Sequence, residues 1–239
     1  MSYLYETHTH TSPASRCGKV SVRETLEYYK RVGYSGVFIT NHFVDGNIGC
    51  DRSLPYSDMI NFYFADYEEG KRLESEIGIS VFCGVESSYK GTDFLIYGLS
   101  REWYLAHLEL ADLKKSEMLP LLMSAGALVV QAHPFREARY IDHIRLFPRH
   151  VQGVEVYNAC RTELENNMAS ILADRYGLLR FSGSDNHVGE GQRTLGGMCF
   201  DSPILSEADF VTRVLSGKGT PFRCEVSDSS DSLDKIALL

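Results

Sequence analysis

Short apolar segments alternate with segments of helical periodicity along most of this chain, and the alternation limits the folds that are open to it. Residues 36–40, 79–85 and 127–132 are three of the short segments. Each is apolar along its length, as expected of parallel strands that helices cover on both faces. Helical patterns, such as those of residues 57–76 and 163–176, separate them. The alternation predicts an α/β fold, either a closed barrel or an open, doubly wound sheet.

Residues that can bind metals stand at the ends of the predicted strands. They are His8, His10, His42, Glu86, His133, Asp185 and His187. In a closed parallel barrel the C-terminal ends of all strands meet on one face, where barrel enzymes place their active sites. In an open sheet the outer strands would lie too far apart for these residues to share a site. We therefore predict a barrel with a metal site at the C-terminal ends of its strands.

His8 and His10 flank a single residue at the end of the first predicted strand. Residues two apart in a strand point to the same side, so the two imidazoles are aimed at one point. Neutral imidazole is a common ligand of zinc, iron and manganese. A lone histidine is more often a hydrogen-bonded loop residue, which is our interpretation of His107, His143 and His150. The metal-site hypothesis depends on the coincidence of several strand ends.

Composition and charge narrow the function further. The length of 239 residues suits one domain over residues 1–239, with a frayed acidic tail over residues 226–239. A chain with a net charge of -8 lacks the excess of positive charge that binds the phosphate backbone of a long nucleic acid. A small anionic substrate remains compatible, because bound cations reverse the local sign. The sequence contains no apolar segment of transmembrane length, no signal-peptide pattern and no C-x-x-C pair, so we expect a cytoplasmic protein without a membrane partner.

Short motifs surround the predicted ligands. They are Thr7-His8-Thr9-His10-Thr11, Ile39-Thr40-Asn41-His42, Gly84-Val85-Glu86, Ala132-His133-Pro134, Gly153-Val154-Glu155-Val156-Tyr157-Asn158 and Gly183-Ser184-Asp185-Asn186-His187. In order and spacing they resemble the motifs of the PHP domain family (polymerase and histidinol phosphatase), over nearly the whole chain from Glu6 to about His187. The resemblance implies a distorted (β/α)7 barrel of PHP type that binds two or three divalent metal ions, of zinc, manganese or iron.

The resemblance also implies how the ligands divide among the ions. The implied ligands of the first ion are His8, His10, Glu86 and Asp185. Glu86 would bridge to a second ion, which His133 also binds. His42 and His187 would bind a third ion.

The sequence departs from the family pattern at two places. Where the family usually has a histidine for the second ion, this chain has Asp93, which we expect to bind the ion through oxygen. Where the family usually has an aspartate or histidine for the third ion, the loop reads Ser15-Arg16-Cys17-Gly18-Lys19. Cys17 could supply a thiolate there, or Arg16 could make the place a substrate contact.

The chemistry that the resemblance implies is hydrolysis of a phosphoester by metal-activated water, since paired ions stabilise both the attacking and the leaving oxygen. Glu86 and Asp185 would act in catalysis. Arg136 is predicted to join them by clamping phosphate with its forked guanidinium. Glu155 is expected to orient a ligand or a substrate group, and Asn158 to contact substrate.

The sequence therefore predicts a metal-dependent phosphoric ester hydrolase of the phosphatase type (EC 3.1.3) that acts on a small phosphorylated metabolite. Histidinol-phosphate phosphatase is the narrower version, although nothing in the sequence selects histidinol over a sugar phosphate or a nucleotide. A nuclease or nucleotide phosphodiesterase that acts on short substrates is the second hypothesis. A non-catalytic metal-binding PHP module, as in some polymerases, is the third, and the large set of predicted ligands argues against it.

Overall fold

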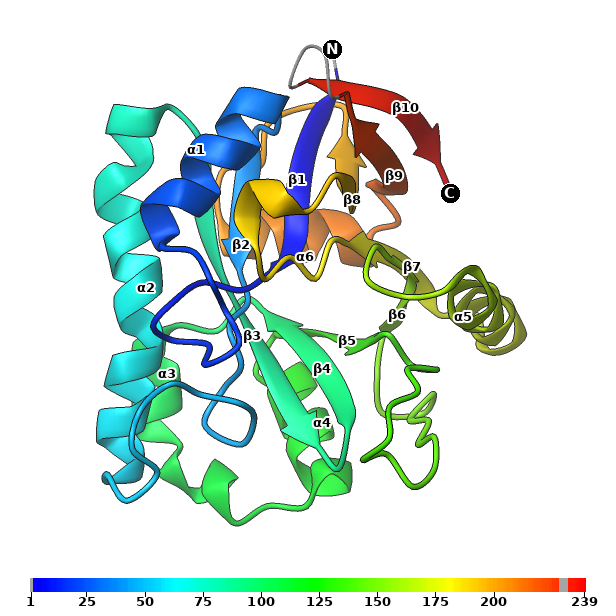
Figure 1. Cartoon of the computed structure of the whole chain (residues 1–239). Coiled ribbons are helices and arrows are strands. Elements are labelled where there is room, and N and C mark those ends of the chain that lie inside the picture. The colour runs from blue at the N-terminus through cyan, green and yellow to red at the C-terminus, as the bar shows by residue number, and fades with distance from the viewer. Residues whose placement is uncertain (1, 228–231) are drawn as a thin grey trace.

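The computed structural model describes residues 2–227 and 232–239, and the ten strands of these residues form one curled sheet (Figure 1). The strands are β1 (Tyr3–Thr9), β2 (Gly36–Ile39), β3 (Ser80–Tyr89), β4 (Thr92–Tyr97), β5 (Leu128–Ala132), β6 (Gly153–Asn158), β7 (Leu179–Gly183), β8 (Thr194–Phe200), β9 (Thr220–Val226) and β10 (Leu233–Leu238). Their order across the sheet is β10-β9-β8-β1-β2-β3-β4-β5-β6-β7. The strands predicted to carry the ligands are therefore neighbours.

Six α-helices of the described residues surround the sheet. They are α1 (Val22–Val32), α2 (Tyr56–Ile77), α3 (Arg101–Ala106), α4 (Lys115–Ser124), α5 (Glu163–Tyr176) and α6 (Glu207–Leu215). Figure 1 shows α1 and α2 side by side on one side of the molecule and α5 at the opposite edge. None of these helices in the described part of the chain is long and apolar enough to cross a membrane.

The sheet contains two parallel parts. β1, β2 and β3 run parallel, and so do β5, β6 and β7. β4 lies antiparallel between β3 and β5, while β8, β9 and β10 extend the sheet beyond β1 as antiparallel strands. The predicted α/β fold is confirmed. The sheet is a curled half-barrel, and its antiparallel strands depart from the regular repeat of a (β/α)7 barrel.

β3 and β4 form an antiparallel hairpin. Its turn residues Lys90 and Gly91 have φ of 50° and 83°, the left-handed pair that a two-residue hairpin turn requires. The prediction that a strand ends at Glu86 is wrong, because β4 supplies hydrogen-bond partners to β3 as far as Tyr89. Since β4 runs antiparallel to β3, its first residues lie beside the C-terminal ends of the parallel strands, which form one rim of the sheet. Asp93 reaches that rim for this reason.

The curl of the sheet brings β7 back towards β1. The hydroxyl of Thr7 donates to the carbonyl of Ser182 over 2.6 Å. Just beyond the two strands, the backbone N–H of His10 donates to the carbonyl of Asn186 over 2.9 Å. The ends of the first and last parallel strands therefore meet at one rim, and the loops that follow them lie side by side.

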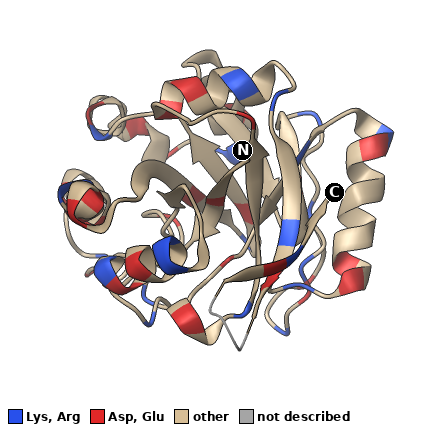
Figure 2. Cartoon of the chain, turned by 90° about the horizontal axis from the view of Figure 1, so that it is seen from above, with Lys and Arg blue, Asp and Glu red and all other residues tan. Residues whose placement is uncertain are grey.

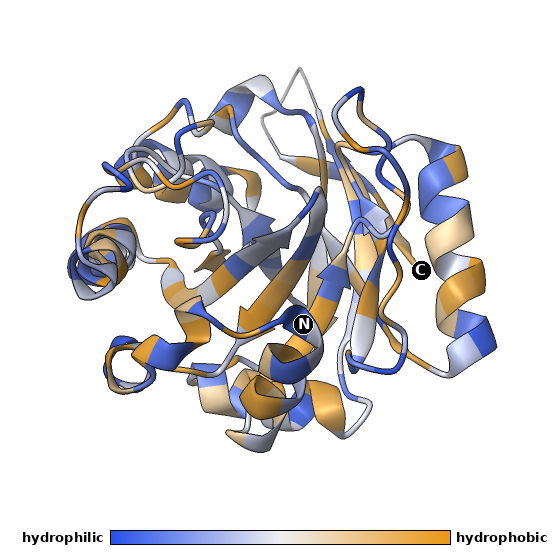
Figure 3. Cartoon of the chain, turned by 90° about the horizontal axis from the view of Figure 1, so that it is seen from below, coloured by the Kyte–Doolittle hydropathy of each residue, from blue (hydrophilic) through white to orange (hydrophobic). Residues whose placement is uncertain are grey.

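Aromatic side chains fill the interior of the curl. The rings of Phe38 and Phe82 are buried and stack with centroids 4.9 Å apart. α6 adds Phe210, whose ring centroid lies 4.4 Å from that of Phe38. In Figure 3 hydrophobic segments alternate with hydrophilic ones along the strands, while hydrophilic residues are frequent on the surrounding helices and loops. Burial of large rings is a major stabilising contribution, and here it supports the strands beneath the rim.

The C-terminal segment differs from the expected frayed tail. Residues 228–231, on which part of that prediction falls, lie outside the described residues. Leu233–Leu238 forms β10, which pairs antiparallel with β9 from Leu233 opposite Val226 to Leu238 opposite Phe222. Pairing with β9 supplies hydrogen-bond partners to the backbone groups of this segment. The composition of the segment did not indicate that it would find such a partner strand.

Candidate metal centre

The carboxylate of Glu86 lies among four imidazoles at the rim. Its Oε1 is 3.2 Å from Nε2 of His8 and 3.3 Å from Nε2 of His133. Its Oε2 is 2.5 Å from Nδ1 of His42 and 3.5 Å from Nε2 of His10. Each oxygen therefore faces its own pair of imidazoles, an arrangement suited to a carboxylate between two cation sites.

Asp185 supplies a second carboxylate beside the first. Its Oδ1 lies 3.2 Å from Nε2 of His10 and 3.5 Å from Nε2 of His8. The same oxygen is 3.5 Å from Nδ1 of His187. Because Asp185 follows β7 and the histidine pair belongs to β1 and its end, the meeting of these two strands builds this half of the centre.

The side chains divide into three groups that could each hold a metal ion. Within each group the ligand atoms lie within 4.8 Å of one another. The groups are His8, His10 and Asp185; His8, Glu86 and His133; and His10, His42 and His187. The structure thus brings together all the predicted ligands except Asp93, which lies beside the second group. His8 belongs to the first and second groups and His10 to the first and third, so the groups form one continuous centre.

Many of the donor atoms are buried without a hydrogen-bond partner among the described residues. They are Nε2 of His8, His10 and His133, Nδ1 of His42, and both carboxylate oxygens of Glu86. A buried polar atom that stays unpaired costs about 1–3 kcal/mol. Divalent cations would satisfy these atoms together, and imidazole with carboxylate is a donor set suited to zinc, manganese or iron. The residues present therefore fit a metal centre.

The electrostatics keep both carboxylates charged. Burial alone would raise the pKa of Glu86, but the imidazoles of His42 and His8 hold it well below its ordinary value. Burial likewise opposes the charge on Asp185, and His8 and His10 hold the pKa of that carboxyl well below its ordinary value. Two charged carboxylates at the centre of a buried cluster provide the negative charge that divalent cations require.

Glu155 of β6 supports the centre from beneath. Its Oε1 lies 2.9 Å from Nδ1 of His8, and its Oε2 accepts from the backbone N–H of His133 over 3.0 Å. If Nδ1 of His8 carries the proton, Nε2 is left free to face the cluster. Asn158 donates to Glu155 over 2.9 Å and to Asp185 over 3.3 Å. The expectation that Glu155 orients a ligand agrees with these contacts. Asn158 was expected to contact substrate. In the structure it is fully buried, and its side chain holds the carboxylates of Glu155 and Asp185.

Two of the candidate ligands have strained backbones. His133 and Asp185 have φ of 25° and 53°, in the left-handed region that residues with a side chain adopt at a cost in free energy. The backbone N–H of His133 donates to Glu155, and Asn158 donates to Asp185, which holds these residues in place. His133 directly follows β5, and Asp185 is the second residue after β7.

Two supporting residues were missed in the sequence. The hydroxyl of Ser15 lies 3.0 Å from Nδ1 of His10 and accepts from the backbone N–H of His42 over 2.9 Å. Glu6, in β1, accepts from the backbone N–H groups of His8 over 2.8 Å and Ser184 over 3.0 Å, and its burial raises its pKa to about 7. A charged residue directly after the apolar Tyr3, Leu4 and Tyr5 was a usable signal for Glu6. A serine in a polar loop offered none for Ser15.

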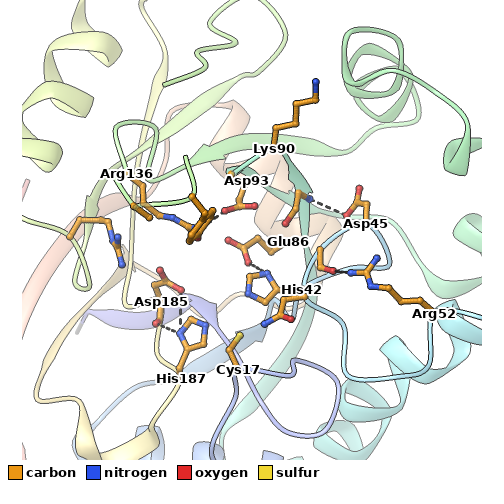
Figure 4. A pocket seen from close by; sticks show the side chains of 17 residues that line it. Cys17, His42, Asp45, Arg52, Glu86, Lys90, Asp93, Arg136, Asp185 and His187 are labelled. Carbon is orange, nitrogen blue, oxygen red and sulfur yellow. Dashed lines mark hydrogen bonds and ion pairs between the residues drawn. The ribbon is translucent and has the colours of Figure 1, made fainter. Parts of the chain in front are cut away.

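A cavity of about 740 Å³ opens over the centre. Figure 4 shows Glu86, His42, Asp185 and His187 at its floor, with Arg136 and Asp93 on one side. Its basic lining residues are Arg52, Lys90, Arg136 and Arg161. The metal-binding groups thus lie at the floor, and the wall around them carries these four cations beside the acidic Asp45 and Asp93. The cations offer contacts to an anionic ligand.

No family model matches the sequence, and no curated protein matches it either. Solved structures do. A two-domain protein from Bacteroides vulgatus that contains a predicted PHP-like metal-dependent phosphoesterase superposes with a TM-score of 0.66 at 14% identity, over 95% of this chain and 77% of that one. The chain has a PHP-like fold.

Two further structures share the PHP-like fold. PsfC from Pseudomonas syringae matches with a TM-score of 0.59 at 15% identity, over 96% of this chain and 93% of that one. The lesion-specific endonuclease PfuEndoQ from Pyrococcus furiosus matches with a TM-score of 0.58 at 10% identity, over 90% of this chain and 56% of that one. At these identities the likeness establishes the fold alone.

Asp93 is paired with Arg136 in this PHP-like fold. Oδ2 of Asp93 lies 3.1 Å from a guanidinium nitrogen of Arg136 and 3.8 Å from Nε2 of His133. Burial and the neighbouring Glu86 raise the pKa of Asp93. Arg136 also donates to the hydroxyl of Tyr140. The guanidinium is thus held at the cavity wall, beside the second group of ligands.

The loop after β1 places Arg16 and Cys17 differently. The guanidinium of Arg16 donates to the carbonyl of Cys50 over 3.3 Å, and Arg16 is not among the described residues that line the cavity. Cys17 does line it. Burial works against a thiolate there, but His187 and His42, which contact the thiol, lower the pKa of Cys17 to about 6. Of the two loop residues, Cys17 is therefore the one directed at the third group of ligands.

The other cations around the cavity were not predicted from the sequence. Arg52 donates to the carbonyls of Val44 and Gly46, which fixes it at the cavity wall. Arg161, two residues before the start of α5, lines the cavity, and its Nε has no hydrogen-bond partner among the described residues. Scattered arginines show no spacing that would single them out in a sequence, because only the fold brings them to one cavity.

Proposed function

We propose that the chain is a metal-dependent phosphoesterase of the phosphatase type, which hydrolyses a small phosphorylated metabolite in the manner of histidinol phosphatase. The observation that carries the proposal is the buried carboxylate of Glu86, whose two unpaired oxygens face different imidazole pairs at the floor of a cavity. The PHP-like fold of metal-dependent phosphoesterases supports it.

We assign the three groups of ligands to two or three divalent ions of zinc, manganese or iron. The ligands of the first ion are His8, His10, Glu86 and Asp185. Glu86, His133 and Asp93 hold the second ion. His42 and His187 hold the third, with Cys17 as an additional donor. When bound, the ions would supply an activated water and positive charge at the phosphoryl group.

The side chains of this chain position the reaction. Glu86 and Asp185 keep the ligand groups together, because their oxygens contact imidazoles of more than one group. Arg136 lines the cavity and would bind a phosphate oxygen pair, and its guanidinium is positioned by Asp93 and Tyr140. Hydrogen bonds fix the orientation of two ligands: Asn158 donates to Asp185, and Glu155 contacts Nδ1 of His8.

The substrate is a small molecule with at least one phosphate. A cavity of about 740 Å³ is in the range of small-molecule sites and is too small to enclose a folded partner. Arg52 and Arg161 stand at its wall beside the metal-binding floor. A substrate with a second polar or anionic group therefore finds contacts beyond Arg136. The overall charge of -8 keeps long nucleic acids unfavourable.

A nuclease or phosphodiesterase acting on short substrates is the second candidate. The observation in its favour is the fold shared with an endonuclease, over 56% of that protein's length. The basic wall of the cavity would serve a short phosphodiester as well as a phosphomonoester.

The deciding experiment is a hydrolysis screen of the full chain after reconstitution with zinc, manganese or iron. The substrates are phosphomonoesters, including histidinol phosphate, sugar phosphates and nucleotides, set against short oligonucleotides and an aryl phosphodiester. We expect the monoesters to be hydrolysed faster. Preference for the diesters would replace the first proposal by the second. Full metal content with no hydrolysis of either class would make the chain a non-catalytic metal-binding module.

A further inference from the structure

Helix α5 carries an apolar stripe that faces solvent. It packs on β6 through Ala169, Leu172 and Ala173, which are buried. On the other side, Leu164 is 68% exposed, Met168 38% and Ile171 67%. The spacing of four and then three residues places these side chains in one row along the helix. Figures 1 and 2 show α5 at the edge of the molecule, apart from the other helices, so none of them covers this row.

The row borders an apolar groove of about 210 Å³. The groove is lined by Phe135, Met168, Ile171, Leu172, Arg175 and Tyr176. Four of these residues follow one another at intervals of three, one and three positions, namely Met168, Ile171, Leu172 and Arg175. Four residues at this spacing form the hole into which a side chain of a facing helix inserts in knobs-into-holes packing. The groove is thus shaped to accept an apolar side chain from another helix.

The charges at the ends of α5 are opposite. Glu163 and Glu165 stand in the first turn, and Arg175 stands in the last turn beside Asp174. Asp174 is neutralised by its ion pair with Arg180, which leaves Arg175 as the cation of this end. In Figure 2 the middle of α5 is uncharged and its charged residues lie towards the two ends. A parallel copy of α5 would set like charges against each other. An antiparallel copy would place Glu163 near Arg175 at both ends of the contact.

We propose that α5 is the interface between two copies of this chain, packed antiparallel about a two-fold axis. Leu164 is the knob that fills the partner's groove, and the partner's Leu164 fills the groove of the first copy. Met168 lies midway in sequence between Leu164 and Leu172, so the axis passes beside it. The surface is self-complementary in shape and in charge, which selects a second copy of the chain over an unrelated partner.

The interface adjoins the metal centre at two points. Phe135, which lines the groove, precedes Arg136, and Arg161 precedes α5 by a short loop. Pairing through α5 would therefore buttress both cavity arginines without covering the cavity itself. The proposal does not depend on the reaction that the centre performs, because it rests only on the outer face of α5.

The test is the oligomeric state of the purified full chain, measured by sedimentation over a range of concentrations. We expect a monomer–dimer equilibrium. Ile171→Glu should raise the dissociation constant by about a hundredfold, because it places a charge in the apolar contact. Leu205→Glu is the matched control, since Leu205 is 81% exposed on a loop outside α5, and it should leave the equilibrium unchanged. Normal metal content would show that both variants are folded.

Charge reversal tests the antiparallel arrangement. Glu163→Arg and Arg175→Glu should each weaken the dimer by about tenfold, and the double variant should restore it. A wild-type chain that stays monomeric would overturn the proposal, as would a dimer that Ile171→Glu leaves intact. A double variant no tighter than the single ones would overturn the antiparallel order.

Discussion

At the scale of single residues, the cavity wall is organised by the pair of Arg136 and Asp93. Their side chains lie 3.1 Å apart, and Asp93 is also 3.8 Å from Nε2 of His133. One carboxylate therefore touches both the candidate phosphate clamp and the ligands of the second ion. Removing the arginine should affect phosphate without removing the ions.

Arg136→Ala should weaken the binding of inorganic phosphate by about tenfold or more, since hydrogen bonds to charged groups contribute about 1.5–3 kcal/mol. Arg136→Lys should recover only part of the loss, because an ammonium keeps the charge but not the fork. The measurement is phosphate inhibition of hydrolysis, with metal content on the same preparation. Unchanged phosphate inhibition in Arg136→Ala would return this residue to a structural role.

At the scale of elements, the centre depends on how closely β7 approaches β1. A Cβ added at Gly183 would lie 2.5 Å from Cβ of His8 and 2.7 Å from Oε1 of Glu155. The glycine at the end of β7 therefore lets the two strands meet beneath the ligands. A larger residue must push the strands apart, because Cβ of His8 cannot move without the backbone of β1, and Oε1 of Glu155 is held 2.9 Å from Nδ1 of His8.

Gly183→Ala should destabilise the fold by about 1–3 kcal/mol through overpacking and lower metal affinity at His8. Gly191→Ala is the control, because a Cβ there would come no closer than 3.4 Å to its nearest neighbour, a side-chain atom of Val188. Thermal unfolding and metal titration of both variants provide the comparison. Equal metal affinity in the two variants would mean that the close approach is not required.

The sequence predicted the elements better than it predicted their directions. The parallel strands and the ligands at their ends follow from apolar segments and motif order. A strand over residues 93–98 was predicted, but its antiparallel direction was not, because the Lys90-Gly91 turn is short and a strand sequence looks alike in either direction. The positions of Ser15 and Arg161 depend on loop paths, and a local pattern carries no information about those.

At the scale of the whole molecule, the unpaired donors at the rim oppose folding until they are satisfied. The buried atoms of His8, His10, His133 and Glu86 lack hydrogen-bond partners in the described residues. Ions that bind the folded chain and not the unfolded one stabilise the fold by mass action. The free energy of unfolding should therefore depend on metal.

Removal of metal by a chelator should lower the midpoint of thermal unfolding by several degrees, because an ion at about 100 times its dissociation constant contributes about 2.7 kcal/mol per site. Returning zinc or manganese should restore the midpoint. Calorimetry with elemental analysis before and after chelation is the measurement. A midpoint that stays constant while the metal is lost would show that the cluster is stable without ions.

The central claim is that Glu86 joins separate metal sites, and the metal stoichiometry of Glu86→Gln tests it most directly. An amide has one neutral acceptor oxygen and cannot balance two cations. Wild-type chain should bind two or three ions. The variant should lose ions on both sides of residue 86 together, and its hydrolytic rate should fall by several orders of magnitude, while the apolar interior keeps it folded. A Glu86→Gln chain that retains the full wild-type stoichiometry would contradict the account.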